Sequence, residues 1–177
     1  MNFIKKRTKV IFLILYTVVI LYCLYFGFGR AARNMEDGTS FSFAIYQIPL
    51  WFPKRFSSDI LKIWIFAMGN LVAFIPFGCL IPEVMPSRHQ RYWKTLIIFL
   101  IAISVLECIQ GFSGFGSFDM EDILVNTIGC SVGYLAYKIA NRTVHLMNWF
   151  VTYIMTAILG TMASVAMAQV LNILFFG

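Results

Sequence analysis

Residues Thr95–Gly111 read TLIIFLIAISVLECIQG, a run that is apolar enough to cross a lipid bilayer except at the carboxylate of Glu107. A charged side chain at the centre of a membrane helix costs about 2.5–3.5 kcal/mol on insertion scales. Such a group therefore usually faces a cavity or a partner inside the protein. Two amides mark the neighbouring apolar segments, Asn70 before this run and Asn126 after it. If these side chains meet, they form a polar site inside a membrane protein.

The composition of the whole chain points to the same class of protein. Of its 177 residues, 60% are hydrophobic and 12% are charged, and the mean hydropathy is +0.79. So few charges would not cover a soluble domain of this size. Because a membrane-spanning helix needs about 20 apolar residues, we predict an all-α, polytopic membrane helix bundle. Residues 1–177 form one domain with about five transmembrane helices, at Val10–Phe28, Ile63–Ile81, Thr95–Gly111, Ile123–Ala140 and Trp149–Phe176.

The first and last of these segments need separate interpretation. The basic start at Lys5–Lys9 resembles that of a secretory signal. However, the apolar stretch after it exceeds the usual 7–15 residues or so, and no small-x-small cleavage site follows. We therefore interpret it as an uncleaved first helix. The fifth segment is longer than a bilayer requires, and we expect tilt or a bent end there.

The distribution of cations predicts the orientation, because cytoplasmic loops of membrane proteins are enriched in Lys and Arg. With a cytoplasmic N-terminus, nine cations lie inside and five lie outside. The outer five all fall in one long loop; they are Arg30, Arg33, Lys54, Arg55 and Lys62. The net charge of +6 then reflects attraction to anionic lipid, and no aromatic-basic module indicates nucleic-acid binding.

Cofactor-binding motifs are not visible in the sequence. The four cysteines lie within predicted spans, without a C-x-x-C pair, and are expected to act as small apolar residues. They are Cys23, Cys79, Cys108 and Cys130. His89 and His145 lie in predicted loops and lack neighbours that could act as ligands. We therefore expect no cofactor, although oxygen ligands at Asp119, Asp122 and Asn126 would suit Mg²⁺ or Ca²⁺.

The long connection Gly29–Lys62 contains an apolar aromatic stretch, Phe41–Pro53. Pro49 and Pro53 argue against a continuous helix there. Trp and Tyr favour the membrane interface, so the stretch could lie in that interface. Equally, it could form a hydrophobic flap packed on the bundle. Both interpretations place apolar side chains near the outer end of the predicted helix bundle.

Helical rise predicts that the polar groups share one level in the outer half of the membrane. At about 1.5 Å per residue, Glu107 lies roughly 6 Å below the outer boundary and Asn70 roughly 10 Å below it. Asn126, near the start of the fourth span, falls at a similar depth. Glu107 and Gln110 are three residues apart and share a helix face. Convergence of side chains from separate spans is therefore expected.

Each polar residue also has a purely structural interpretation. Asp119 and Asp122 could cap the fourth helix. Asn70, Gln110 and Asn126 could form hydrogen bonds between helices, and Glu107 could be a protonated acid bonded to a neighbour. Glu121 projects from another helix face and is expected to be solvated.

Pro76 and several Gly, Ser and Ala residues indicate how the predicted helices bend and pack. Pro76 would free the carbonyl of Val72 and either open space beside Asn70 or produce a plain bend. Small residues at four-residue spacing let helices approach closely in lipid. They occur as Gly129 and Gly133 in the fourth span and as Gly160, Ser164 and Ala168 in the fifth.

Three segments together resemble the motif blocks of the VanZ-like family, in order and in spacing. They are NLVAFIPFG from Asn70, SVLECIQ from Ser104 and GSFDMEDILVNTIG from Gly116, with a weaker element at Gln47–Pro49. The resemblance covers roughly residues 10–140 and leaves the helix at 149–176 as an addition. It carries over to Asn70, Pro76, Glu107, Gln110, Asp119, Asp122, Asn126 and Gly129. Gly116 stands where some members have Arg, so an anion contact by that Arg is not expected.

The resemblance implies a small bacterial integral membrane protein of the cell membrane. The founding member is associated with resistance to teicoplanin, a glycopeptide antibiotic with a lipid tail. We hypothesise a binding or protective role, in which Asn70, Gln110, Asp119, Asp122 and Asn126 engage a membrane lipid or a lipidated small molecule. The alternative is an enzyme acting on a lipid-linked headgroup, with Glu107 as catalytic acid or base. Transport by an intramembrane carboxylate is a third class, disfavoured by the lack of an inverted repeat. The pattern names neither the ligand nor the oligomeric state.

Overall fold

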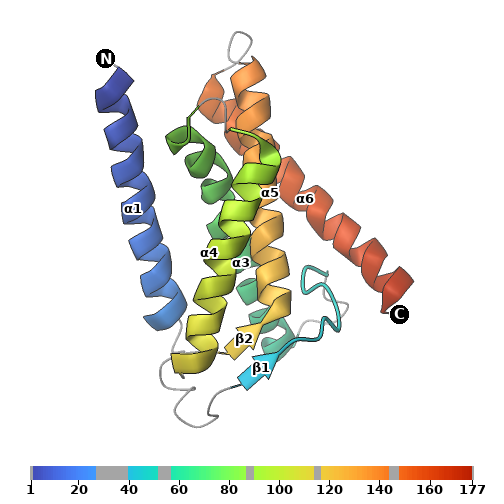
Figure 1. Cartoon of the computed structure of the whole chain (residues 1–177). Helices are drawn as coiled ribbons and strands as arrows, with labels where there is room; N and C mark the ends of the chain where they lie inside the picture. The colour runs from blue at the N-terminus through green and yellow to red at the C-terminus, as the bar shows by residue number, and fades with distance from the viewer. Residues whose placement is uncertain are drawn as a thin grey trace.

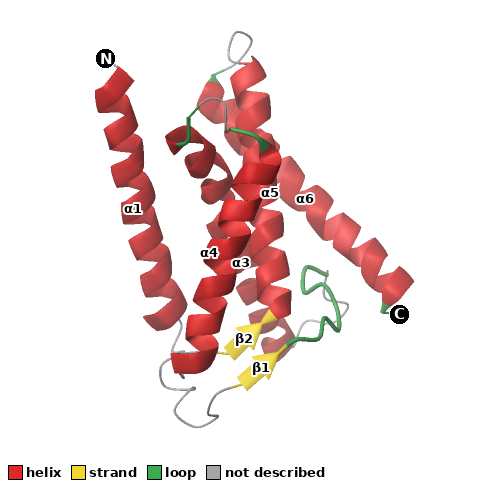
Figure 2. Ribbon diagram, in the orientation of Figure 1, coloured by secondary structure: helices red, strands yellow, loops and turns green. Residues whose placement is uncertain are grey.

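The computed structural model describes residues 2–26, 40–51, 57–86, 90–113, 117–143 and 148–176. Five long helices dominate it (Figure 2), and all are long and apolar enough to cross a membrane. They are α1 (Asn2–Phe26), α3 (Ser58–Val84), α4 (Tyr92–Ser113), α5 (Met120–Thr143) and α6 (Trp149–Phe175). Two short strands, β1 (Ser40–Ser42) and β2 (Ser117–Asp119), complete the fold. The predicted all-α membrane bundle of five spans is confirmed, and each inner helix extends beyond its predicted apolar core.

Helix α5 lies at the centre of the bundle (Figure 1). Of its membrane-spanning window, 61% is buried inside the protein, against 6% for α1 and 6% for α6. Helices α3 and α4 pack on α5, α1 stands beside α3, and α6 crosses α5 obliquely. The polar segments of the sequence therefore belong to the three inner helices.

Glycines bring the backbones of α3 and α5 into direct contact. A β-carbon on Gly129 would overlap the carbonyl oxygen of Leu71, and one on Gly133 would overlap that of Ile75. In the other direction, a β-carbon on Gly78 would overlap the carbonyl oxygen of Cys130. The predicted small-residue face of the fourth span is thus the α3–α5 contact, where close approach gives van der Waals packing in lipid.

Helix α1 is attached to α3 by polar contacts at separate levels. Tyr16 Oη donates a hydrogen bond of 2.8 Å to the carbonyl oxygen of Ala73, which precedes Pro76 by three residues. Membrane helices tolerate proline when neighbouring side chains satisfy nearby backbone groups. Helix α3 continues through Pro76 to Val84. Next to that last residue, Glu83 forms an ion pair with Lys9 of α1.

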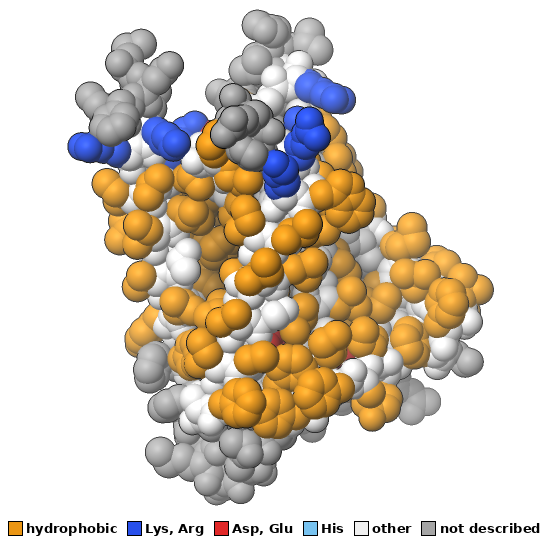
Figure 3. Space-filling model, viewed as in Figure 1, with side chains coloured by type: hydrophobic (Ala, Val, Ile, Leu, Met, Phe, Trp, Pro, Cys, Tyr) orange, Lys and Arg blue, Asp and Glu red, His pale blue; other side chains and the backbone are white. Residues whose placement is uncertain are grey.

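The two ends of the bundle differ in charge and in structure (Figure 3). Lys and Arg side chains gather where α1 begins and α5 ends, and we call this the cationic end. Strands β1 and β2 lie at the opposite end (Figure 1), which we call the strand end. Several residues interpreted from the sequence lie outside the described residues: Arg30, Arg33, Lys54, Arg55, Arg88, His89, Gly116, His145, Phe52 and Pro53.

The glycine contact predicts a position-specific effect on stability. Gly133→Ala should destabilise the protein by about 1–3 kcal/mol, because the obstructing atom belongs to the rigid backbone of α3. Gly69→Ala is the matched control, since nothing lies within 4 Å of its β-carbon and Ala favours helix over Gly. Thermal denaturation in detergent should show a lower midpoint for Gly133→Ala alone. Equal midpoints for the two variants would contradict the contact.

Candidate functional site

Glu107 lies on the buried face of α4, as its spacing from the other buried residues requires. Thr95, Phe99, Ile103, Glu107 and Gln110 recur every three or four residues and face the bundle. Glu107 is 2% exposed and Gln110 is 3% exposed. After Thr95 the face is apolar at Phe99 and Ile103, and it becomes polar toward the strand end. Glu107 is thus directed into the protein and away from acyl chains, as expected for a carboxylate in a membrane helix.

Gln110 and Glu107 form a pair within one helical turn. With the amide of Gln110 oriented so that its nitrogen faces the carboxylate, Nε2 lies 3.3 Å from Oε1 and 3.3 Å from Oε2. Amide orientation is assigned from such donor and acceptor patterns, and this orientation supplies a donor where the carboxylate needs one. Tyr25 of α1 also interacts electrostatically with Glu107. Helix α1 and α4 therefore both contribute polar groups at this level.

A second polar pair joins α3 to α5. Asn70 Nδ2 donates a hydrogen bond of 3.1 Å to Asp122 Oδ1. The side chain of Asp119 instead caps α5, because its Oδ1 accepts from the backbone N–H of Glu121 at 2.8 Å. Of the structural interpretations given above, capping therefore holds for Asp119 and interhelical hydrogen bonding holds for Asn70. Asp122 faces α3, so its role goes beyond a cap.

Asn126 is the exception among these polar groups. Its side chain is 0% exposed, and neither amide atom has a hydrogen-bond partner among the described residues. A buried polar group without a partner costs about 1–3 kcal/mol. The expected interhelical hydrogen bond of Asn126 is therefore not formed in this structure. An unsatisfied amide at the centre of the bundle offers a donor and an acceptor to a small polar ligand or a water molecule.

Glu107 and Asn126 share one level in the bundle. Glu107 precedes Ser113, the last residue of α4, by six positions, and Asn126 follows Met120, the first residue of α5, by six. Both lie about 9 Å from the strand end of their helices. Three sets of polar side chains therefore lie in the strand-end half of the bundle. They are the pair of Glu107 and Gln110, the pair of Asn70 and Asp122, and the single residue Asn126. Asp119 lies at the start of α5, closer to the strand end than this level.

The apolar connection before α3 forms a flap on the strand end, which we define as residues 43–51. Ile48, Pro49 and Leu50 are buried, whereas Phe43 and Tyr46 are 71% and 75% exposed. The flap interpretation thus holds for residues 48–50, which pack on the bundle, while Phe43 and Tyr46 present aromatic side chains outward. A location in the membrane interface stays a prediction.

Two polar side chains hold the flap. Glu121 Oε1 accepts from the backbone N–H groups of Tyr46 at 2.9 Å and Gln47 at 3.1 Å. Asn172 of α6 exchanges two hydrogen bonds of 2.8 Å with the backbone of Ile48. The expectation that Glu121 is merely solvated was wrong, because the position of the flap could not be derived from the helix face alone. Asn172 was not identified from the sequence.

An aromatic patch surrounds the strands; we define it as Phe41, Phe43, Phe112 and Phe118. Strands β1 and β2 pair in parallel, with Phe41 opposite Phe118. The ring of Phe41 lies 5.2 Å from that of Phe112 and 6.0 Å from that of Phe118, and Phe43 lies 5.0 Å from Phe118. Phe112 is 77% exposed. The lack of a side chain at Gly111, next to Gln110, leaves room for the rings of Phe41 and Phe118.

An open groove runs from this patch along the outer face of α4. It has a volume of about 460 Å³, and Ser104, Cys108 and Phe112 line it at four-residue spacing. Its walls are mainly apolar side chains of one helix, so it suits a hydrocarbon chain lying against α4. The strand end thus combines exposed aromatic rings, an apolar groove on α4 and a set of polar side chains in the interior of the bundle.

No group of three or more His, Cys, Asp or Glu side chains comes together within the described ranges. The carboxylate of Asp119 is engaged in capping and that of Asp122 bonds to Asn70. Together with Asn126 they were the oxygen ligands considered for a divalent cation.

Comparison with known proteins identifies the family. The family model described as VanZ/LLP1 matches residues 12–141, and the chain therefore belongs to the VanZ-like family. The match includes most of α1 and the polar segments of α3, α4 and α5, and it ends before α6. No curated protein and no solved structure shows a significant match to the chain.

The flap contacts predict a local change in dynamics. Asn172→Leu removes two hydrogen bonds to Ile48, each contributing about 0.5–1.5 kcal/mol, so amide exchange in residues 43–51 should accelerate by about tenfold or more. Asn172→Asp keeps the acceptor for the Ile48 N–H and should give an intermediate rate. Hydrogen–deuterium exchange read by mass spectrometry measures both, with peptides of α3 as the internal reference. Unchanged exchange in Asn172→Leu would show that the flap is held by other contacts.

Proposed function

We propose that this chain protects the bacterial cell envelope by binding an amphiphile at the strand end of the bundle. The ligand class is a lipid-tailed glycopeptide of the teicoplanin type, or a lipid-linked envelope precursor. One observation carries the proposal: the exposed aromatic patch continues into the apolar groove on α4, next to the turn that holds Gln110 and Glu107.

Orientation forms part of the proposal. The described cations concentrate at the cationic end (Figure 3), and positive residues favour the cytoplasmic side. With the N-terminus in the cytoplasm, the strand end faces the outer leaflet. Aromatic side chains favour the membrane–water interface, which supports placing Phe43, Tyr46 and Phe112 at that boundary. A lipid tail entering from the outer leaflet would then meet the patch first.

We assign the proposed roles according to whether each side chain is exposed or buried. The aromatic rings and the groove are accessible and would hold the apolar tail, because burying a phenyl ring contributes roughly 1.5–3 kcal/mol. Asn70, Asp122, Gln110 and Asn126 lie inside and would orient or receive polar parts of the ligand. Asp119 and Glu121 would act indirectly, Asp119 by starting α5 and Glu121 by holding the flap.

An enzymatic role is the second candidate, and the burial of Glu107 favours it. A buried carboxyl group with an amide 3.3 Å away has the setting of a general acid or base. Such a role would require the lipid-linked headgroup to reach the level of Glu107, about 9 Å from the strand end of α4. The binding role and the enzymatic role therefore differ in whether function requires the carboxyl group of Glu107.

Removing exposed rings should abolish protection. In bacteria expressing the chain, Phe43→Ser with Phe112→Ser should lose most of any increase in the inhibitory concentration of a lipid-tailed glycopeptide. Phe150→Ser is the matched control, since Phe150 is 64% exposed on α6 near the cationic end. A glycopeptide without a lipid tail should give no difference among these strains. Full protection by the double variant, at equal protein levels, would refute the role of the patch.

Replacing the carboxylate distinguishes the two candidates. Glu107→Gln keeps the size of the side chain and removes its acid–base chemistry. Under the binding proposal, protection falls by a few-fold at most, because the apolar contacts remain. Under the enzymatic alternative it disappears while the protein still accumulates, since loss of a general acid or base costs about 10²–10⁴-fold in rate. Susceptibility assays with immunoblots of membrane fractions separate these outcomes.

A further inference from the structure

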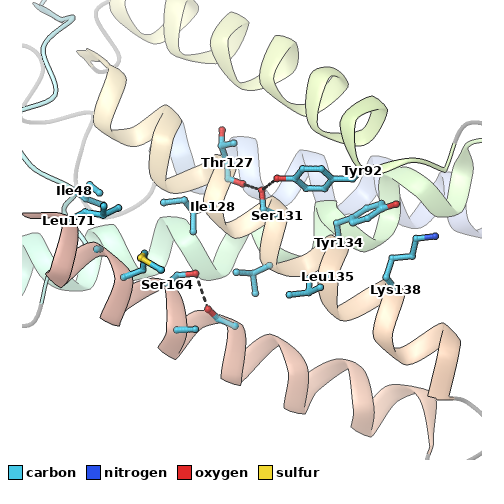
Figure 4. A pocket seen from close by; sticks show the side chains of 15 residues that line it. Ile48, Tyr92, Thr127, Ile128, Ser131, Tyr134, Leu135, Lys138, Ser164 and Leu171 are labelled. Carbon is cyan, nitrogen blue, oxygen red and sulfur yellow. Dashed lines mark hydrogen bonds between the residues drawn. The ribbon is translucent and has the colours of Figure 1, made fainter.

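A second groove lies between α5 and α6, on the side of the bundle away from α1 (Figure 4). Its volume is about 660 Å³, within the range of about 300–1,000 Å³ that is typical of small-molecule sites. Ile48 and Leu171 stand at one end and Lys138 at the other. The oblique course of α6 leaves this space beside the central helix. It is separate from the groove on α4.

The hydroxyl groups in the groove are mostly turned to partners within the protein. Ser131 Oγ donates to the carbonyl oxygen of Thr127 at 2.8 Å and lies 3.1 Å from Tyr92 Oη. Ser164 Oγ donates to the carbonyl oxygen of Gly160 at 2.8 Å. Figure 4 shows these bonds along the walls. The remaining lining is formed mainly by Val, Leu, Ile, Ala and Met side chains, so the groove presents hydrocarbon to its occupant.

The part of the groove that follows α5 has about the length of one acyl chain. From Thr127 to Lys138 it follows eleven residues of α5, or about 16 Å. Half of a bilayer's hydrocarbon core is about 15 Å. The groove crosses the middle of the bundle, and Ile48 and Leu171 mark its end toward the strands. Lys138 lies five residues before Thr143, where α5 ends, so the other end of the groove opens at the leaflet of the cationic end. An acyl chain of that leaflet has the matching length, chemistry and direction.

Lys138 supplies charge complementarity at the mouth of the groove. Its side chain is exposed, and within the described part of the chain no carboxylate pairs with it. Basic side chains at the cytoplasmic ends of membrane helices attract anionic headgroups, each contributing about 1 kcal/mol. A second copy of this chain would complement it less well, because Glu83, the acidic residue described at the cationic end, already pairs with Lys9.

We propose that the α5–α6 groove is a binding site for an anionic phospholipid of the leaflet at the cationic end. One acyl chain fills the groove against Val132, Leu135 and Met167, and the phosphate lies at the ammonium group of Lys138. The lipid occupies space between α5 and α6 and thereby supports the packing of α6. The headgroup end of this site, at Lys138, opens at the cationic end, opposite to the amphiphile site proposed at the strand end.

Lipid retention by the purified full-length protein tests this site. Native mass spectrometry would compare phosphatidylglycerol with phosphatidylcholine of the same acyl chains. Wild-type protein should retain the anionic lipid preferentially. Lys138→Gln should reduce that retention about fivefold, the factor that corresponds to one interfacial cation. Lys6→Gln is the control, since it removes the same charge at the same end from α1.

A second pair of variants tests the acyl chain. Ala163→Phe fills the groove from α6 and should abolish retention of both lipids, whereas Ala166→Phe, on the same helix but outside the lining, should not. Equal retention by wild type and Lys138→Gln, or by Ala163→Phe and Ala166→Phe, would overturn the proposal. So would equal retention of the two lipids by wild type. A wild-type dimer that Ala163→Phe alone dissociates would assign the groove to a second copy instead.

Discussion

The backbone contact between α3 and α5 is the constraint on which the rest of the structure depends. Gly129 and Gly133 let α5 lie directly against the carbonyl groups of Leu71 and Ile75. In a bilayer, such contact replaces the hydrophobic driving force that packs soluble helices. It also fixes the register of the two helices, so that Asn70 meets Asp122, which precedes Gly129 by seven residues on α5. Any shift along this contact would separate the polar pair and leave both groups facing apolar surroundings.

Much of this arrangement could be predicted from the sequence. Hydropathy located the five spans, and helical rise placed Glu107 and Asn126 at one level, because both quantities depend on residues close in the chain. Contacts that join distant segments could not be predicted. Glu121 meets the backbone of Tyr46, 75 positions away, and Asn172 meets Ile48, 124 positions away. Helix faces alone say nothing about which loop covers a helix end. The functional roles of the polar residues stay predictions.

The polar groups of the inner helices differ in how well they are satisfied. Asp119, Asn70 and Asp122 have hydrogen-bond partners, and Gln110 faces Glu107. Asn126 has none among the described residues. A Leu side chain of similar size would bury the same space without the cost of an unsatisfied amide. Packing alone therefore does not explain an amide at this position.

The flap connects the family region to the helix beyond it. Glu121 lies within residues 12–141, and Asn172 lies in α6, outside that match. Each holds the flap by backbone hydrogen bonds, from α5 and α6 respectively. Because the flap carries Phe43 and Tyr46, the position of these rings depends on α6 as well as on α5. The groove between α5 and α6 ends at Ile48, the residue that Asn172 binds. The groove and the aromatic patch therefore both adjoin this one short segment.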